Sequence, residues 1–180
     1  MLNAEQKIIF AGPVGAGKTT AINAISDIPT VGTEARATDE TAKLKHNTTV
    51  AMDYGVLNLG NGQKVHLYGT PGQERFDFMW EILTQKGIGL VLLVDNRRDD
   101  PLEDMRFYLE SFRDFISDRA VVIGVNGMET KNRPGLHSYQ KRLADLGMKP
   151  PLFEVDPRKR DDVKTMLLAL LSMLDPGLCR

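Results

Sequence analysis

The feature that most constrains the fold of this chain is the segment Gly12-Pro13-Val14-Gly15-Ala16-Gly17-Lys18-Thr19, which has the pattern G-x-x-x-x-G-K-[ST]. The apolar run at 7–11 before it is typical of a buried strand, and residues 19–26 after it favour a helix. A glycine-rich turn between a strand and a helix lets backbone N–H groups converge on phosphate oxygens at the positive end of the helix. The segment therefore predicts a phosphate-binding loop.

Two side chains of this loop have distinct chemical tasks. The ammonium of Lys18 would contact the β- and γ-phosphates of a nucleotide, and the hydroxyl of Thr19 would face Mg²⁺, an ion that prefers oxygen ligands. The alternative is a glycine-rich turn with an incidental lysine, which the flanking strand and helix make the weaker interpretation. We predict that the nucleotide is bound by the loop residues Gly12, Val14, Gly15, Ala16, Gly17, Lys18, Thr19 and Thr20.

Strand-like and helix-like segments alternate along almost the whole chain. A glycine-rich turn at 60–63 between strand-like segments at 50–59 and 64–68 predicts an antiparallel hairpin. The other predicted elements are a polar loop at 28–47, helices at 73–86, 102–116, 137–146 and 161–174, and strands at 88–94, 120–125 and 152–155. This order implies an α/β P-loop NTPase fold, with a mainly parallel six-stranded sheet, one antiparallel strand and helices on both faces.

Length and charge narrow the possible functions. The 180 residues have room for one domain, which we expect to span 1–180. Lys and Arg number 23 against 24 Asp and Glu, so the positive surplus that favours nucleic-acid binding is missing, and we expect no nucleic-acid partner. The apolar runs are far shorter than the roughly 20 residues of a transmembrane helix. With a single cysteine, Cys179, and no signal-peptide pattern, we expect a cytoplasmic protein without a transmembrane segment.

Two further segments should lie beside the phosphate loop. Thr48-Thr49-Val50-Ala51-Met52-Asp53-Tyr54 ends the long polar loop, and Gly69-Thr70-Pro71-Gly72-Gln73-Glu74-Arg75-Phe76 follows the hairpin. Both are expected at the carboxyl edge of the sheet, where ligands of open α/β folds bind. At such a place a threonine can meet Mg²⁺ and the γ-phosphate, a glycine N–H can bond the γ-phosphate, and a glutamine can orient an attacking water.

With these motifs the chain resembles the Ras-like small GTPases, whose switch segments carry a T-I-G-x-D-F-like string and D-x-x-G-Q-E-R-F. It is most similar to the bacterial gliding type of the MglA kind, in the branch encoded beside roadblock-domain proteins, on the strings at 33–38 and 67–76. The resemblance implies a single GTP-binding (G) domain, GTP or GDP with Mg²⁺ as ligands, and a roadblock/LC7-type partner.

By position, the resemblance gives roles to three residues of the switch segments. Thr49 matches the threonine that binds Mg²⁺ together with Thr19, although Thr48 is a rival and Thr49 could simply begin a strand. Gly72 matches the glycine that senses the γ-phosphate, and Gln73 the catalytic glutamine, unless Gln73 only starts a helix. The expected catalytic set is therefore Gln73, Lys18 and Gly72.

The chain departs from the Ras-like pattern at the metal site. The aspartate of D-x-x-G is replaced by Gly69, which removes the carboxylate that ordinarily holds a water of the Mg²⁺ shell. Asp95, at the end of a predicted strand, is a candidate replacement, although an aspartate there also suits a turn. Asp53 is interpreted as a strand and surface residue.

The guanine-reading motif N-K-x-D is altered as well. Asn126-Gly127-Met128-Glu129 keeps the asparagine, loses the lysine and has Glu129 for the aspartate, and Val155-Asp156-Pro157-Arg158 stands in place of the last base-contacting loop. Asn126, Glu129 and Asp156 are therefore candidate base-binding residues, and Asn126 could instead be a turn residue before glycine. GTP stays favoured over ATP.

Val14 lies at the loop position where Ras-like proteins commonly have glycine and where an arginine finger approaches. A branched side chain there should obstruct a finger and displace Gln73, so slow intrinsic hydrolysis is expected, with Arg36 or Arg75 as candidate charges within the chain. The preferred interpretation is a GTP-hydrolysing molecular switch in bacterial signalling, a monomer or weak dimer. The alternatives are a non-hydrolysing nucleotide-bound scaffold and an ATP-binding P-loop protein such as a small-substrate kinase.

Overall fold

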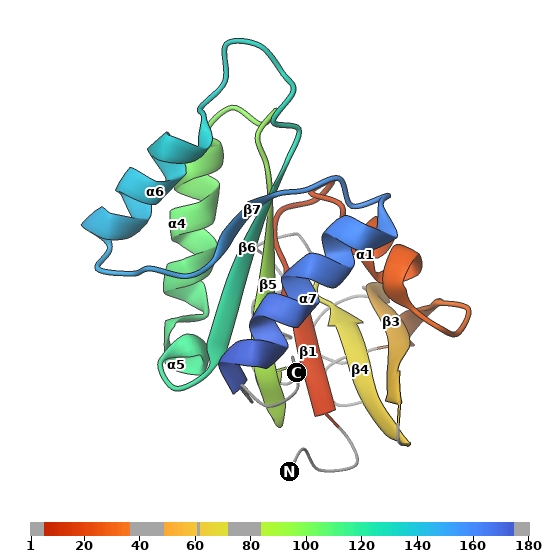
Figure 1. The fold of residues 1–180 in the computed structure, drawn as a ribbon. Coiled ribbons are helices and arrows are strands. Elements are labelled where there is room, and N and C mark those ends of the chain that lie inside the picture. Colours follow the sequence, from red (N-terminus) through yellow and green to blue (C-terminus); the bar gives the residue numbers. More distant parts are fainter. Residues whose placement is uncertain (1–5, 37–48, 61, 72–83, 175–180) are drawn as a thin grey trace.

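The computed structural model describes residues 6–36, 49–60, 62–71 and 84–174, and Figure 1 shows how their helices and strands are arranged. The elements, labelled as in that figure, are β1 (Gln6–Ala11), α1 (Lys18–Ile25), β2 (Val31–Arg36), β3 (Thr49–Gly60), β4 (Gln63–Gly69), β5 (Gly87–Asp95), α4 (Pro101–Ser111), α5 (Arg113–Ile116), β6 (Ala120–Asn126), α6 (Leu136–Asp145), β7 (Leu152–Glu154) and α7 (Arg160–Leu174).

The strands of the described residues form one sheet in the order β2-β3-β4-β1-β5-β6-β7. β1 pairs in parallel with β4 and β5, and the parallel arrangement continues through β6 to β7. β3 is antiparallel to both β2 and β4. β3 is thus the one strand of the described sheet that runs against the others, so the predicted mixed α/β class with one antiparallel strand is confirmed.

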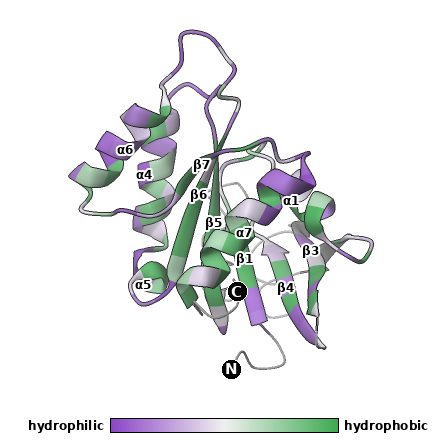
Figure 2. Cartoon of the chain, in the orientation of Figure 1, coloured by the Kyte–Doolittle hydropathy of each residue, from purple (hydrophilic) through white to green (hydrophobic). Residues whose placement is uncertain are grey.

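Helices cover both faces of the sheet because the central strands are apolar on both sides. On β1, Ile8 and Phe10 pack toward α1 and α7, whereas Ile9 and Ala11 pack toward α4 and α6. β5 alternates in the same way between the two hydrophobic clusters. Figure 1 shows α7 lying across one face beside α1, with α4 and α6 together on the other, and Figure 2 shows the apolar colour along the central strands.

The ends of several helices follow the sequence signals. The carboxylate of Asp100 accepts a hydrogen bond from the backbone N–H of Glu103 at 3.0 Å, and Pro101 occupies the first turn, so Asp100 caps α4 as an N-terminal residue should. Gly147 has φ +71° and follows the end of α6, as predicted for a glycine that ends a helix. The predicted hairpin is confirmed as β3 and β4.

Two details differ from the predictions, and a third cannot be compared. The segment at 28–47 was expected to be a polar loop, but Val31–Arg36 forms β2, a seventh strand beyond the predicted six. Pairing with β2 satisfies the backbone hydrogen-bonding groups of β3 at 49–54. This pairing between segments distant in sequence has more effect than the polar composition of 31–36. The predicted helix at 102–116 is divided at Phe112 into α4 and α5. The predicted helix at 73–86 lies mostly outside the described residues.

Within the described residues, no helix combines the length and the apolar character that crossing a membrane requires. Cys179 and the first five residues, on which the expectations about targeting rested, lie outside the described part.

Candidate nucleotide-binding site

The predicted phosphate loop connects β1 directly to α1, as its sequence pattern requires. Gly12 has φ +142°, and a Cβ atom there would lie 2.0 Å from the carbonyl oxygen of Leu93 in β5. Gly17 has φ +103°, and a Cβ atom there would lie 2.5 Å from the ring of Pro157. Both glycines are therefore demanded by the backbone conformation and by close neighbours, and the loop packs between β5 and the segment that follows β7.

Lys18 is the charged residue of the loop and is only 7% exposed. Its Nζ donates hydrogen bonds to the carbonyl oxygens of Gly12 and Pro13, at 2.6 and 2.9 Å. Burial lowers the pKa of the ammonium from 10.5 to about 8, against a smaller raising effect from the Asp53 carboxylate. This ammonium is poorly solvated and has only two carbonyl oxygens as partners, so an anionic ligand would stabilise its charge. This agrees with the predicted contact with nucleotide phosphates.

Thr19 begins the exposed side of α1, and its hydroxyl contacts the sheet. The Oγ1 atom donates a hydrogen bond to Oδ2 of Asp53 in β3, at 2.5 Å. Asp53 is the register partner of Gly69 in β4. We expected Asp53 to be a strand and surface residue; it does lie in a strand, but its carboxylate reaches the phosphate loop and is partly buried.

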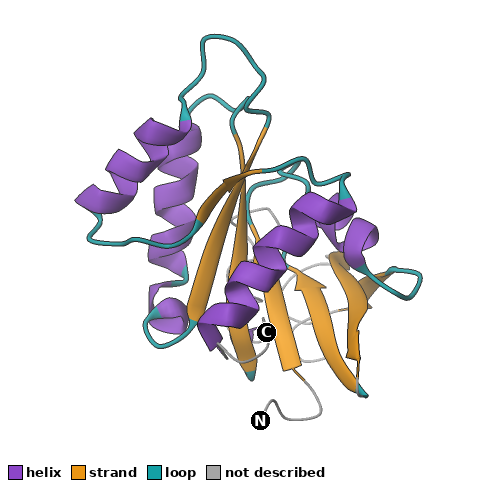
Figure 3. Cartoon of the chain, viewed as in Figure 1, coloured by secondary structure: helices purple, strands orange, loops and turns teal. Residues whose placement is uncertain are grey.

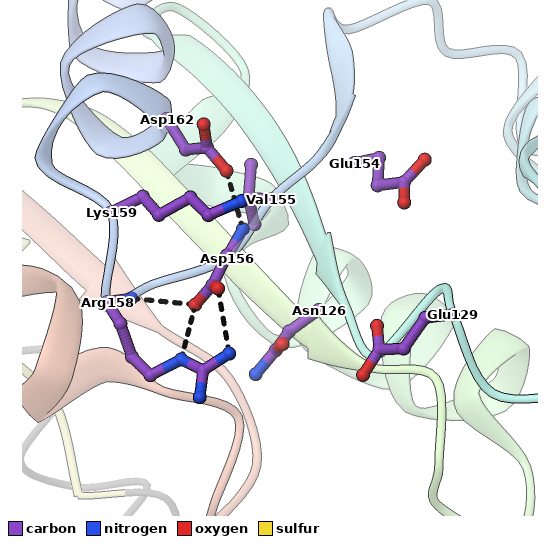
Figure 4. Close-up of a pocket in the computed structure, with 8 residues that line it drawn as sticks. All are labelled: Asn126, Glu129, Glu154, Val155, Asp156, Arg158, Lys159 and Asp162. Carbon is purple, nitrogen blue, oxygen red and sulfur yellow. Dashed lines mark hydrogen bonds and ion pairs between the residues drawn. The ribbon is translucent and has the colours of Figure 1, made fainter.

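The three candidate base-binding residues lie together. Asn126 at the end of β6, Glu129 in the following loop and Asp156 after β7 line one pocket of about 520 Å³, whose other lining residues are Glu154, Val155, Arg158, Lys159 and Asp162. Figure 4 shows the side chains of Asn126, Glu129 and Asp156 around it. In the view of Figure 3, the loops after β5 and β6 extend beyond the carboxyl ends of the strands, the edge where α/β folds bind ligands.

Asn126 connects this pocket to the phosphate loop. Its Nδ2 atom donates a hydrogen bond to the carbonyl oxygen of Ala16, at 3.4 Å. Asn126 and Pro157 also lie beside Gly17, since both fall within 4 Å of a Cβ atom placed there. The pocket and the loop are thus adjacent parts of one site, as binding of a base and its phosphates by one ligand would require.

Arg158 holds the carboxylate of Asp156. Its Nε and Nη2 atoms and its backbone N–H all donate to Asp156, at 2.8 to 3.0 Å. The hydrogen bond from this side chain is the main cause that lowers the pKa of Asp156 to about 2. Asp156 is therefore an ionised residue of the pocket lining whose carboxylate is held by Arg158.

Asp95, the candidate replacement for the missing metal-site aspartate, has another partner. Its Oδ1 accepts from Nε and the backbone N–H of Arg97, at 2.7 and 3.0 Å, and its Oδ2 accepts from Nη2 at 3.2 Å. Burial would raise the pKa of Asp95, but these hydrogen bonds and the charge of Arg97 bring the pKa below its usual value. The oxygens of Asp95 pair with Arg97, whereas Asp53 contacts Thr19, and a metal role for Asp95 stays a prediction.

The stem of Arg97 also lies where the altered N-K-x-D motif lacks its lysine. Gly127 has φ +77°, and a Cβ atom there would meet Cγ and Nε of Arg97 at 3.0 Å. A side chain at 127 would therefore be strained by the positive φ and would require the stem of Arg97 to shift. The sequence shows that the lysine of N-K-x-D is missing, but the place of Arg97 beside Gly127 could be found only from the structure.

Some of the other predicted residues lie in the described part of the chain, and the rest lie outside it. Val14 is 57% exposed on the phosphate loop, Thr20 is exposed on α1, and Thr49 is the first residue of β3. Thr48, Gly72, Gln73 and Arg75 lie outside the described residues, so their roles stay predictions. Arg36 is the last residue of β2.

Residues 10–173 match a family model described as "Conserved hypothetical ATP binding protein". An uncharacterized protein of Methanocaldococcus jannaschii is 35% identical over 91 residues, half of each chain. The Ras-related protein Rab-44 of Homo sapiens is 29% identical over 147 residues, 78% of this chain and 13% of the relative. The Ras-related protein RABE1e of Arabidopsis thaliana is 22% identical over 171 residues, covering 91% and 72%.

This chain thus spans about half the length of the archaeal relative and a small part of human Rab-44. The Ras-related matches agree with the Ras-like motifs, while the bacterial gliding type rests on the motifs alone. Together with the phosphate loop and its adjoining pocket, the matches support a nucleotide-binding, P-loop GTPase-like protein, and the chain belongs to the family described as conserved hypothetical ATP binding proteins.

Proposed function

We propose that this protein is a small GTPase that binds GTP or GDP with Mg²⁺ and acts as a molecular switch. The observation that carries the proposal is the contact of Asn126 with Ala16, which joins the adjoining pocket to the phosphate loop. A nucleotide lying across this contact would place its phosphates on the loop at Gly12–Thr19 and its base between Glu129 and Asp156. Lys18, Thr19 and the loop N–H groups would hold the phosphates.

The chemistry of the pocket favours guanine. Its lining includes four carboxylate side chains, Glu129, Glu154, Asp156 and Asp162, which accept hydrogen bonds and cannot donate them when ionised. Guanine presents two kinds of N–H donor on its Watson–Crick edge, N1–H and N2–H₂, whereas adenine presents one donor beside an acceptor. Arg158 holds the Asp156 carboxylate and the lining also includes the donors Asn126 and Lys159, so the preference depends on Glu129, which could accept from N1–H and N2–H₂. We therefore expect guanine to bind better than adenine.

Binding of ATP is the second candidate, because the family description names ATP. It is also consistent with the departures from N-K-x-D, since Gly127 contributes no stem over the base and Glu129 is one methylene longer than aspartate. GTP binding and ATP binding would both use the phosphate loop, and they differ only in the base that the pocket binds.

Analysis of the nucleotide retained by the purified protein, followed by titration with fluorescent GDP and ADP in the presence of Mg²⁺, separates the two. We expect guanine nucleotide to be retained and GDP to bind at least tenfold more tightly, about 1.4 kcal/mol. Preferential binding of ADP would overturn the choice of base and leave the P-loop site intact. If neither nucleotide bound, the proposed function would be wrong.

We further propose slow intrinsic hydrolysis, with Gln73, Gly72 and Lys18 as the catalytic residues and Thr49 with Thr19 at Mg²⁺. Val14 supports slow turnover, because its exposed side chain lies on the loop where a finger residue would approach. Output would come from partner proteins that distinguish the two nucleotide states, among them a roadblock/LC7-type regulator. A single-turnover GTP assay decides between this switch and a non-hydrolysing scaffold, for which no phosphate release is expected.

A further inference from the structure

The metal site of a P-loop protein needs more than the loop threonine. Mg²⁺ keeps several waters when it binds nucleotide phosphates, and carboxylates commonly hold these waters. In this chain the usual aspartate position is Gly69, which has no side chain. A carboxylate beside Thr19 must therefore come from another residue.

The register of the hairpin places a carboxylate next to the vacant position. Asp53 in β3 lies opposite Gly69 in β4. Opposite residues of an antiparallel pair project their side chains from the same face of the sheet. A side chain at either position can therefore reach the same side of the phosphate loop.

Asp53 occupies the space that an aspartate at 69 would need. A Cβ atom placed on Gly69 would lie 3.1 Å from both Cβ and Oδ2 of Asp53, and 3.2 Å from Cδ1 of Ile22. Gly69 does not have a positive φ, so its backbone conformation does not require glycine. A side chain at 69 would therefore require Asp53 and Ile22 to shift.

The hydrogen bond from Thr19 to Asp53 suits a metal ligand. A hydroxyl has one donor and two lone pairs. When Oγ1 of Thr19 donates its proton to Oδ2 of Asp53, its lone pairs stay available for a cation, and the second carboxylate oxygen stays available for a metal-bound water.

We propose that Asp53 is the positioning residue of the Mg²⁺ site, replacing from the neighbouring strand the aspartate that the chain lacks at Gly69. It orients the hydroxyl of Thr19 and holds a water of the Mg²⁺ shell. This inference rests on the proposed nucleotide binding and adds a residue to it that the motif pattern did not identify.

The test measures how strongly Mg²⁺ tightens nucleotide binding. Fluorescent GDP and ADP are titrated into the wild type with Mg²⁺ and with EDTA, and the tighter nucleotide is kept for the variants. For Asp53→Asn we expect the ratio of the two affinities to fall by about 10-fold or more, with the affinity in EDTA nearly unchanged. The exposed Asp145→Asn at the end of α6 is the control and should keep the wild-type ratio.

A second variant moves the carboxylate back to the neighbouring strand. In Asp53→Gly combined with Gly69→Asp, the contacts of residue 69 with Asp53 are removed while the contact with Cδ1 of Ile22 stays. The ratio should therefore recover part of the way toward the wild-type value. Gly69→Asp alone should lower it, because the new side chain meets Asp53 at 3.1 Å. Circular dichroism and thermal unfolding establish that each variant is folded, and if Asp53→Asn does not fold, the double variant carries the test.

The outcomes are separable. If the wild type binds no nucleotide, the proposed function fails and the metal site with it. If the wild type binds nucleotide more tightly with Mg²⁺, but Asp53→Asn keeps that ratio, the role of Asp53 is refuted while the nucleotide site stands. Failure of the double variant to recover any of the ratio, although folded, would also contradict the replacement of one strand position by the other.

Discussion

Replacing Lys18 by methionine should stabilise the nucleotide-free protein while it abolishes nucleotide binding. The ammonium is 7% exposed, and burial lowers its pKa from 10.5 to about 8. A shift of this size corresponds to about 3 kcal/mol against the charged form in the folded state. The two hydrogen bonds to Gly12 and Pro13 recover part of this cost. At pH 7 we therefore expect Lys18→Met to raise the free energy of unfolding by about 2 kcal/mol.

The difference in stability between the wild type and Lys18→Met should depend on pH. Because the pKa of Lys18 is lower in the folded protein than in the unfolded chain, unfolding takes up a proton between about pH 8 and 10.5. The stability of the wild type should therefore rise with pH in this window, while a methionine has nothing to titrate. By pH 9.5 the advantage of the variant should have shrunk by about 2 kcal/mol.

Urea unfolding of nucleotide-free protein at both pH values measures the difference, with fluorescent GDP titration as the readout of binding. Lys141→Met, on the exposed side of α6, is the control and should show neither the gain at pH 7 nor the change with pH. The reasoning would be refuted by a Lys18→Met variant that is less stable than the wild type at pH 7 and keeps the same difference at pH 9.5.

Three further predictions test other parts of the site. Asn126→Ala should weaken nucleotide binding by about 10-fold, because it removes the contact between pocket and loop, and isothermal titration would show this; unchanged affinity would argue against the joined site. Gly12→Ala should lower the free energy of unfolding by more than about 3 kcal/mol, since its Cβ would lie 2.0 Å from the oxygen of Leu93, and a urea titration that showed a smaller loss would contradict this. Val14→Gly should speed single-turnover GTP hydrolysis, and equal rates would rule out obstruction by this exposed side chain.

Much of the fold was predictable because local signals agreed with one another. The phosphate loop, the capping residue Asp100 and the helix-ending Gly147 are short-range features, and the structure confirms their places. The strand β2 was not predictable, because its polar residues form a strand only through pairing with β3. The gathering of Asn126, Glu129 and Asp156 was implied by their places in the Ras-like base-contacting segments, and the structure brings them to one pocket.

The sequence by itself determined that this chain has a P-loop site at the carboxyl edge of an α/β sheet, and that the usual metal-site aspartate is missing. Which residue takes its place was decided by tertiary structure. Gly60 pairs with Gln63 at the hairpin turn, and that register, continued without a shift, would set Tyr54 against Gly69. An irregularity between Asn58 and Gly60 moves the pairing by one residue and sets Asp53 there instead. A one-residue shift exchanges the faces of every side chain on a strand, so this bulge, which no local pattern revealed, brings the carboxylate to Thr19.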